Sequence, residues 1–216
     1  MAHIKAYKRA STGALRMHCN RERGQIGGKY RYGNQDIKPE YFEYNRRFPG
    51  DKNFRLSDPK YWIERQERET GKAVRKDANV LASVVITLPE QYKDYPYEQQ
   101  VELLQQAGNY CFSVFGKKVG NVTNLVYLDL HFDETTPHLH FGFVPLDDRL
   151  HINSKKVLNR RVFQRFHEGL DEYLSEHLDF YHGGVLLTDD QRQEKYGFKD
   201  KSLWGSNLTT RSPRTE

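Results

Sequence analysis

The sequence predicts an α+β fold, a two-layer sandwich in which an antiparallel sheet packs its apolar side against helices. Three observations lead to this prediction. Residues 125–145 alternate between apolar and polar side chains on both sides of a turn, as the arms of a β-hairpin do. Residues 79–88 are an apolar run rich in β-branched residues, typical of a central strand. Residues 96–115 and 159–178 carry apolar residues at three- and four-residue steps, as amphipathic helices do.

The N-terminal segment predicts a strand followed by a helix. Residues 2–9 alternate as a short strand does, with Ala2, Ile4 and Ala6 on one side. The tripeptide that starts at Ser11 interrupts this alternation. A Ser/Thr cap in it predicts a helix over residues 14–23.

A second helix is predicted over residues 57–73. Ser57 or Asp58 can cap its start, and Pro59 suits its first turn. Gly71 fits its end, because glycine readily adopts the left-handed conformation that terminates helices.

The two long helices predict one shared core, and the chain after them becomes polar. Residues 179–188 predict an edge strand. The domain then covers residues 1–188, and residues 189–216 form a polar C-terminal tail. The stripe over 96–115 consists of Val101, Leu104, Ala107, Cys111 and Phe115, and that over 159–178 of Val162, Phe163, Phe166, Leu170 and Leu174.

The composition excludes several protein classes. An apolar fraction of 37% is enough for a packed core in a chain of 216 residues. No apolar run approaches the roughly 20 residues needed to span a bilayer, and no apolar segment of a signal peptide follows the N-terminus. Cys19 and Cys111 are too few for a disulfide framework. These features predict a cytoplasmic protein without a membrane segment.

The positive charge is concentrated in one part of the chain. Residues 1–79 carry a net charge of +9 and residues 80–216 a net charge of −4. A basic surface of this kind indicates a polyanion such as nucleic acid as partner. Aromatic residues alternate with the basic ones over 29–32 and 41–48, a mixture typical of proteins that bind single-stranded nucleic acid.

The predicted hairpin places three histidines on one face. In its first arm, Val126, Leu128, Leu130 and Phe132 point to one side and His131 to the other. A turn over Asp133–Pro137 follows. In the second arm, apolar residues at 139, 141 and 143 alternate with His138, His140 and Gly142. All three histidines therefore converge near the end of the hairpin, opposite its apolar face.

Three converging imidazoles predict a divalent transition-metal site with positions left open for substrate. The softness of imidazole as a ligand suits Zn²⁺, Co²⁺ and Ni²⁺. Asp133 and Glu134 lie beside this site in the sequence. Either carboxylate could orient an imidazole N–H or accept a proton.

The motif H-x-D-E-x-x-P-H-x-H over 131–140 resembles the metal motif of MobV-type plasmid mobilisation relaxases, also called Pre/Mob proteins, which belong to the HUH endonucleases. The resemblance extends over most of the first 175 residues. It includes an N-x-D-I-x-P segment over 34–39, Tyr44-Asn45, and Arg75-Lys76-Asp77-Ala78. His18-Cys19-Asn20-Arg21 is similar to the family's histidine motif, although the family usually has Asn directly after the histidine.

The resemblance implies the HUH fold, in which central strands of an antiparallel sheet carry metal-binding histidines. It implies a metal-dependent, site- and strand-specific DNA endonuclease that nicks plasmid DNA at a transfer origin and rejoins the strand. His18 is then the nucleophile that becomes linked to the 5′ phosphate, Arg21 holds charge on the phosphorus, and Glu134 is the base or a support of the metal site. Asp133 lies in the shell behind the ligands, and the metal is Mn²⁺ or Mg²⁺.

The expected partner is plasmid DNA at the origin of transfer, single-stranded or folded into a hairpin. The resemblance adds a conjugative coupling protein, and a dimer formed through a C-terminal region that family members usually carry and this chain lacks. The residues expected to contact DNA are Arg16, Arg23, Lys29, Arg31, Tyr44, Arg75 and Lys76.

Two alternatives remain open from the sequence. A rolling-circle replication initiator or other HUH enzyme would use a tyrosine as nucleophile, and Tyr44 is the first choice because it lies in a basic segment. A DNA-binding module stabilised by a metal would bind DNA without cleaving it. Adduct formation by a His18→Ala protein would favour the first alternative, and binding without cleavage in any metal would favour the second.

Overall fold

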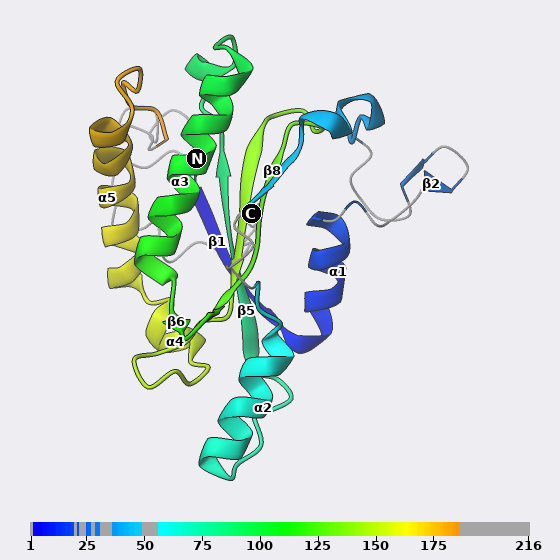
Figure 1. The fold of residues 1–216 in the computed structure, drawn as a ribbon, viewed down its shortest axis with the longest axis vertical. Coiled ribbons are helices and arrows are strands. Elements are labelled where there is room, and N and C mark those ends of the chain that lie inside the picture. Colours follow the sequence, from blue (N-terminus) through cyan, green and yellow to red (C-terminus); the bar gives the residue numbers. More distant parts are fainter. Residues whose placement is uncertain are drawn as a thin grey trace, which may run out of the picture.

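The computed structural model describes residues 2–19, 21, 25–26, 29–30, 36–48 and 56–185. Figure 1 shows the arrangement of its elements. In chain order these are β1 (Ala2–Lys8), α1 (Arg9–Cys19), β2 (Gln25–Ile26), β3 (Lys29–Tyr30), the 3₁₀ helix η1 (Pro39–Tyr44), β4 (Arg46–Phe48), α2 (Pro59–Thr70), β5 (Asn79–Thr87), the 3₁₀ helix η2 (Glu90–Tyr92), α3 (Tyr97–Phe115), β6 (Lys118–Val119), β7 (Val122–Thr123), β8 (Leu125–His131), β9 (His138–Phe143), α4 (Ser154–Val157) and α5 (Arg160–His177).

The main sheet has five strands in the order β1-β5-β9-β8-β4, and every neighbouring pair is antiparallel. The predicted hairpin is β8–β9, and β9 is the middle strand of the sheet. The predicted strand over 79–88 is β5, which lies between β1 and β9. The α+β fold with an antiparallel sheet is therefore confirmed.

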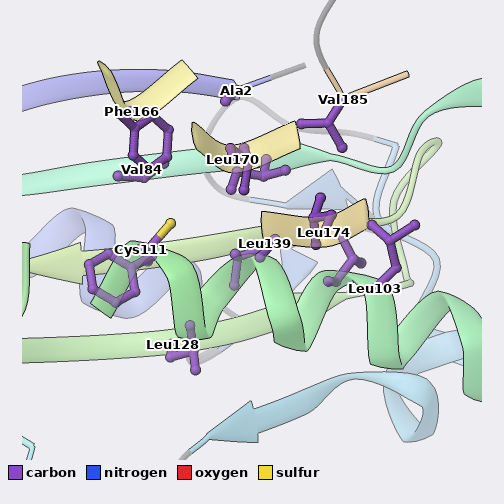
Figure 2. Packing of buried hydrophobic residues seen from close by; sticks show 14 of the residues in the cluster. Ala2, Val84, Leu103, Cys111, Leu128, Leu139, Phe166, Leu170, Leu174 and Val185 are labelled. Carbon is purple, nitrogen blue, oxygen red and sulfur yellow. The ribbon is translucent and has the colours of Figure 1, made fainter. Parts of the chain in front are cut away.

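The core lies between the sheet and the two long helices. Helices α3 and α5 lie together on one face of the sheet (Figure 1). Figure 2 shows Cys111 of α3 and Phe166, Leu170 and Leu174 of α5 among side chains from the strands, such as Leu139. The apolar stripes predicted for the two helices thus face this core. No helix in the described part of the chain is both long and apolar enough to cross a bilayer.

The opposite face of the sheet, which carries the histidines, is partly covered by α1 (Figure 1). Leu15 and Cys19 of α1 pack against Leu81 of β5 and Tyr127 of β8. The sequence predicted helices only on the apolar face of the sheet. The position of α1 on the histidine face was therefore not expected. Its position matters because α1 ends beside the histidines.

A bulge corrects one part of the predicted hairpin. Leu125 and Tyr127 pair with Phe143 and Gly142 respectively, so the register shifts at Val126. Leu125 consequently belongs to the main core, while Val126 packs with residues on the opposite face. The prediction that Val126 shares a face with Leu128 is wrong, because one extra residue in a strand inverts the alternation before it.

Two predicted elements differ from the structure. The first helix begins at Arg9 and ends at Cys19. Thr12 does not cap its start, because Thr12 lies inside the helix and its hydroxyl donates to the Arg9 carbonyl. Residues 179–185 form no strand, and 186–188 lie outside the described residues. Gly183 and Gly184 have φ angles of 90° and 105°, which are incompatible with an extended strand. The predicted tail over 189–216 also lies outside the described residues.

Candidate metal centre and active site

The hairpin register brings the three histidines of β8 and β9 together. His131 pairs with His138, and His140 pairs with Asp129 on the same face. The ring centroids are 5.3 Å apart for His131 and His138, and 4.7 Å apart for each of the other two pairs. At most 9% of each residue is exposed. The convergence predicted from alternation is therefore present, in a buried position.

Two of the imidazole nitrogens are spaced as ligands of one ion would be. The Nε2 atoms of His138 and His140 lie 2.9 Å apart. Two nitrogens that bind one ion at about 2.1 Å and at right angles are separated by about 3 Å. The Nδ1 of His138 lies 2.8 Å from the Thr136 carbonyl, to which an N–H there would donate. That tautomer leaves the Nε2 lone pair free for a metal.

His131 gives a second indication that the residues fit a metal ion. It is 1% exposed, and neither ring nitrogen has a hydrogen-bond partner among the described residues. A buried polar atom without a partner is costly unless something satisfies it. Two overlapping groups of side chains could hold an ion, with ligand atoms within 4.8 Å of one another: His18, His131 and His140, and His131, Glu134 and His138.

Glu134 lies between the imidazoles. Its Oε1 is 3.6 Å from Nδ1 of His131, 3.9 Å from Nε2 of His138 and 3.6 Å from Nε2 of His18. Burial alone would raise its pKa, but the nearby His131 and His138 and the Arg21 guanidinium lower the pKa of Glu134 to about 2. An ionised carboxylate therefore lies at the centre of the histidine cluster.

Asp133 connects the hairpin turn to the segment after α1. Its side chain is fully buried and accepts two hydrogen bonds from Arg21, of 2.7 Å from Nε and 2.5 Å from Nη2. Arg21 also donates to Glu134 over 2.7 Å. The carboxylate of Asp133, expected behind the metal ligands, thus contacts the guanidinium directly.

Arg21 reaches this position through a left-handed turn. Its φ is 51°, an uncommon value for a residue with a side chain. Its amide and its Nη1 both donate to the His18 carbonyl, over 3.1 and 3.2 Å, which caps the end of α1. The backbone strain of such a residue, about 1–3 kcal/mol, is typical of functional sites.

His18 comes to the cluster from the end of α1. Its ring centroid is 5.4 Å from that of His131 and 5.2 Å from that of His140. Its Nδ1 is 3.5 Å from Nη1 of Arg21. Burial and then the Arg21 charge lower the pKa of His18 to about 4, which keeps the imidazole neutral near pH 7. Burial also lowers the pKa of His138 and His140.

An ion pair between the buried Asp129 carboxylate and the half-exposed Arg47, beside the histidines, was not predicted. Asp129 is 2% exposed, pairs in register with His140, and accepts a 2.6 Å hydrogen bond from Nε of Arg47. Burial raises the pKa of Asp129, and Arg47 opposes that shift. The alternation of β8 already placed Asp129 on the histidine face. Its partner Arg47 could not be predicted, because the short edge strand β4 has no recognisable alternation in the sequence.

The residues expected to contact DNA are dispersed. Tyr44 is 40% exposed on η1, and its ring packs against Tyr41 and Tyr97. Arg75 and Lys76 are exposed and precede β5, at the end of that strand opposite Thr87, the residue that pairs with His138. At about 3.3 Å per residue, the length of β5 separates them from His138 by roughly 25 Å. Arg23 and Arg31, and the side chains of Arg16 and Lys29, lie outside the described residues.

Comparisons with known proteins identify relatives of this chain. The family model described as "Plasmid recombination enzyme" (Mob_Pre) matches residues 1–198. The chain is 27% identical over 187 residues to a plasmid recombination enzyme of Streptococcus agalactiae, covering 82% of this chain and 36% of that protein. A plasmid recombination enzyme type 2 of Staphylococcus aureus is 27% identical over 206 residues, covering 94% of this chain and 46% of that protein. The chain thus spans less than half the length of these curated relatives.

Solved structures agree with these relatives. The chain resembles a Mn-bound crystal structure of the MobM relaxase domain with plasmid pMV158 oriT DNA at pH 6.8, with a TM-score of 0.65 and 25% identity over 82% of this chain and 86% of that one. A second such structure, at pH 4.6, has a TM-score of 0.67 and 24% identity over 87% and 90% of the two chains, and supports the fold. The resemblance to MobV-type relaxases drawn from the sequence is confirmed, and the chain belongs to the plasmid recombination enzyme family, Mob_Pre.

Proposed function

We propose that this chain is a plasmid mobilisation relaxase, which nicks one strand of DNA at a transfer origin and stays attached to the new 5′ end through His18. The observation that carries the proposal is the position of His18. Helix α1 brings it within 5.4 Å of the centroids of His131 and His140, which come from the hairpin. A neutral imidazole beside a set of metal-ligating side chains is suited to attack a phosphate.

Different residues have different roles in the proposed reaction. His131, His138 and His140 would hold a divalent ion, which would supply Lewis acidity to the scissile phosphate and to the departing oxygen. His18, neutral near pH 7, forms a bond from an imidazole nitrogen to phosphorus. The bond from phosphorus to the 3′ oxygen breaks. That oxygen takes up a proton from water to become a hydroxyl, while the phosphorylated ring releases its remaining N–H proton to water.

Arg21 and Glu134 prepare the nucleophile. The Glu134 carboxylate, 3.6 Å from Nε2 of His18, stabilises the positive charge that the ring gains when it attacks. The Arg21 guanidinium holds Glu134 in place and lies close enough to share the negative charge on the phosphate. The phosphohistidine retains the energy of the broken bond, so attack by a 3′ hydroxyl can reverse the step and rejoin the strand.

The proposed metal is Mn²⁺ or Mg²⁺, and the related MobM relaxase domain is Mn-bound. Its crystals also contain plasmid pMV158 oriT DNA, which supports oriT DNA as the substrate class here. Such a protein would act on plasmid DNA in the cytoplasm. From the family resemblance we also propose a conjugative coupling protein as partner, and a dimer formed through the C-terminal region that family members usually carry.

A tyrosine nucleophile is the second candidate mechanism. Tyr44 is exposed and accessible to DNA. In the described part of the chain, however, its ring contacts are with Tyr41 and Tyr97 rather than with a histidine. Its side chain is therefore less well placed than that of His18 for attack on a phosphate held beside the hairpin histidines.

Denaturing gels of labelled single-stranded oligonucleotides from candidate transfer origins, with Mn²⁺, test the proposal. We compare wild type with His18→Ala and Tyr44→Phe, using His177→Ala, on the exposed end of α5, as a histidine control. The histidine mechanism predicts a protein–DNA adduct that only His18→Ala loses. An adduct lost only in Tyr44→Phe would replace the mechanism, and DNA binding without cleavage in any metal would indicate a binding module.

A further inference from the structure

Exposed aromatic side chains gather on the 3₁₀ helix η1. In the described part of the chain, large apolar side chains exposed by at least 37% are Tyr41, Phe42, Tyr44, Tyr61 and Val114. The first three, at 43, 37 and 40%, lie on η1. Leaving three neighbouring rings in water is unfavourable unless they bind something.

The 3₁₀ geometry of η1 places its tyrosines and its glutamates on different faces. A 3₁₀ helix has three residues per turn, so residues three apart lie one above the other. Tyr41 and Tyr44 share one face, with ring centroids 5.9 Å apart, and Glu40 and Glu43 share another. The two carboxylates are thus separated from the pair of tyrosine rings, although they alternate with them in the sequence.

The row of rings leads from the open surface to the histidine hairpin. The centroid of Tyr44 lies 5.5 Å from that of Tyr97, and Tyr97 lies 4.9 Å from Phe132. Phe132 directly follows His131, but its side chain packs on the opposite side of the hairpin, against the main core. The row of rings therefore reaches the hairpin on the side that faces α3, at the level of the turn beside the histidines.

Both ends of η1 are fixed to the hairpin turn. The Lys38 amide donates to the Asp133 carbonyl over 2.7 Å, and the Phe132 amide donates to Oδ1 of Asn45 over 2.7 Å. Cations flank the row: the Lys38 ammonium lies 5.7 Å from the Tyr41 ring, and the Arg46 guanidinium lies 5.2 Å from the Tyr97 ring. The aromatic surface is held at a set position and carries positive charge at each end.

We propose that Tyr41 and Tyr44, with Phe42 on the adjoining face of η1, form a platform on which unpaired bases of single-stranded DNA stack as the strand leaves the metal site. This inference rests on the proposed function. Lys38 and Arg46 meet the phosphates on either side of the stacked bases. Rings flanked by cations match single-stranded nucleic acid, because every base has a face that stacks and every linkage has a charge. A protein partner would instead have to desolvate Lys38, Arg46 and the two glutamates.

The test measures binding of fluorescein-labelled oligothymidylate to the protein in EDTA, where no cleavage competes. Tyr41→Ala and Phe42→Ala should each weaken binding at least about fivefold, the lower limit for loss of one base–ring stack. Tyr41→Phe, which keeps the ring, should bind as wild type does. Tyr61→Ala, which removes an equally exposed tyrosine on α2, is the matched control and should leave the affinity unchanged.

Photo-crosslinking supplies a readout that does not depend on affinity. Oligothymidylate carrying 5-iodouracil should crosslink to Tyr41, Phe42 or Tyr44 and not to Tyr61. The platform is overturned if Tyr41→Ala and Phe42→Ala bind oligothymidylate as tightly as Tyr61→Ala does. It is also overturned if sedimentation shows that these variants change the oligomeric state while their affinity for DNA stays the same. Adducts formed with origin DNA by wild type test the proposed function separately, so a protein that forms the adduct but shows no loss in these variants refutes the platform alone.

Discussion

Arg21 and Asp133 form a buried, two-bonded ion pair, although 112 positions separate them in the sequence. The pair joins the turn after α1 to the turn between β8 and β9. Because His18 belongs to the first segment and Glu134 to the second, the pair fixes the proposed nucleophile against the hairpin that carries the three histidines. Arg21 therefore has a structural role that is distinct from any contact with phosphate.

Removal of the Arg21 charge should destabilise the fold strongly. Arg21→Gln leaves the fully buried Asp133 carboxylate without its cation, and breaking a buried pair in this way costs about 3–5 kcal/mol. Arg21→Gln combined with Asp133→Asn should cost less than the sum of the two single changes, with a coupling of at least about 1 kcal/mol. Urea unfolding in EDTA measures each free energy.

A surface ion pair of the same chemistry provides the control. Arg75 bonds Asp77 in a fully exposed position, so Arg75→Gln should change the free energy of unfolding far less than Arg21→Gln does. Equal costs for Arg21→Gln and Arg75→Gln would show that the Arg21–Asp133 pair does not hold the two turns together.

Metal affinity should depend on the hairpin histidines. His131→Ala and His140→Ala should each weaken Mn²⁺ binding by at least about tenfold in isothermal titration calorimetry, because each removes a ligand. Co²⁺, Ni²⁺ and Zn²⁺ should bind more tightly than Mn²⁺, as the order of divalent affinities for nitrogen ligands requires. His177→Ala should leave Mn²⁺ binding unchanged. Wild-type affinity in His140→Ala would exclude that residue as a ligand.

The convergence of the three hairpin histidines was predictable because the information for it is local. Strand alternation has a period of two, so the spacing of His131, His138 and His140 across a short turn already places them on one face. The caps of α2 were predictable for the same reason: Asp58 accepts from the Lys60 amide, and Gly71 has a φ of 66°. Each of these features depends on residues that are close in the chain.

Features that depend on distant residues escaped prediction. Nothing near His18 indicates that α1 folds over Leu81 and Tyr127, so only the family resemblance pointed to its place in the site. The bulge at Val126 depends on how β8 registers against β9. The Arg47–Asp129 pair requires β4 at the sheet edge, and that strand is only three residues long.

The metal-free protein should lose stability as the pH falls below about 6.5. Burial lowers the pKa of His18 to about 4 and also lowers the pKa of His138 and His140 from their ordinary value of 6.5. Between those values the unfolded chain binds protons that the folded chain excludes, so acid favours unfolding. Each such proton contributes about 1.4 kcal/mol per pH unit. Urea unfolding in EDTA between pH 7 and pH 5 should show a loss of about 2–5 kcal/mol.

The lower limit of pH 5 keeps Glu134 out of this measurement. Its pKa is about 2 in the folded protein, so the stability that it contributes is lost only below its ordinary value of 4.5. His140→Ala should reduce the slope of the unfolding free energy against pH, between pH 7 and pH 5, by up to one proton. His177→Ala, at an exposed position, is the control and should leave that slope unchanged. A flat dependence in wild type would mean that the buried histidines are protonated without cost.

Gly142 should tolerate no side chain, because the Tyr127 ring lies directly over it. A Cβ at position 142 would overlap the ring atoms Cε1, Cζ and Cε2 of Tyr127, which is 4% exposed. Gly142→Ala should therefore cost about 1–3 kcal/mol through overpacking. Tyr127 packs against Cys19 of α1, so displacement of its ring should also move His18 away from the three hairpin histidines. Gly142→Ala should then lower the rate of adduct formation more than it lowers Mn²⁺ affinity.

Gly13 in α1 makes the matched comparison. No atom lies within 4 Å of a Cβ built at Gly13, so Gly13→Ala should stabilise the protein by about 0.5–1 kcal/mol, as alanine does in a helix. If Tyr127 is the obstacle at Gly142, the cost of Gly142→Ala should shrink in a Tyr127→Ala background, because the overlapping ring is absent. An unchanged cost there would place the strain in the backbone of β9 itself. Equal losses of adduct formation and Mn²⁺ affinity in Gly142→Ala would mean that the substitution acts on the ligands rather than on the position of α1.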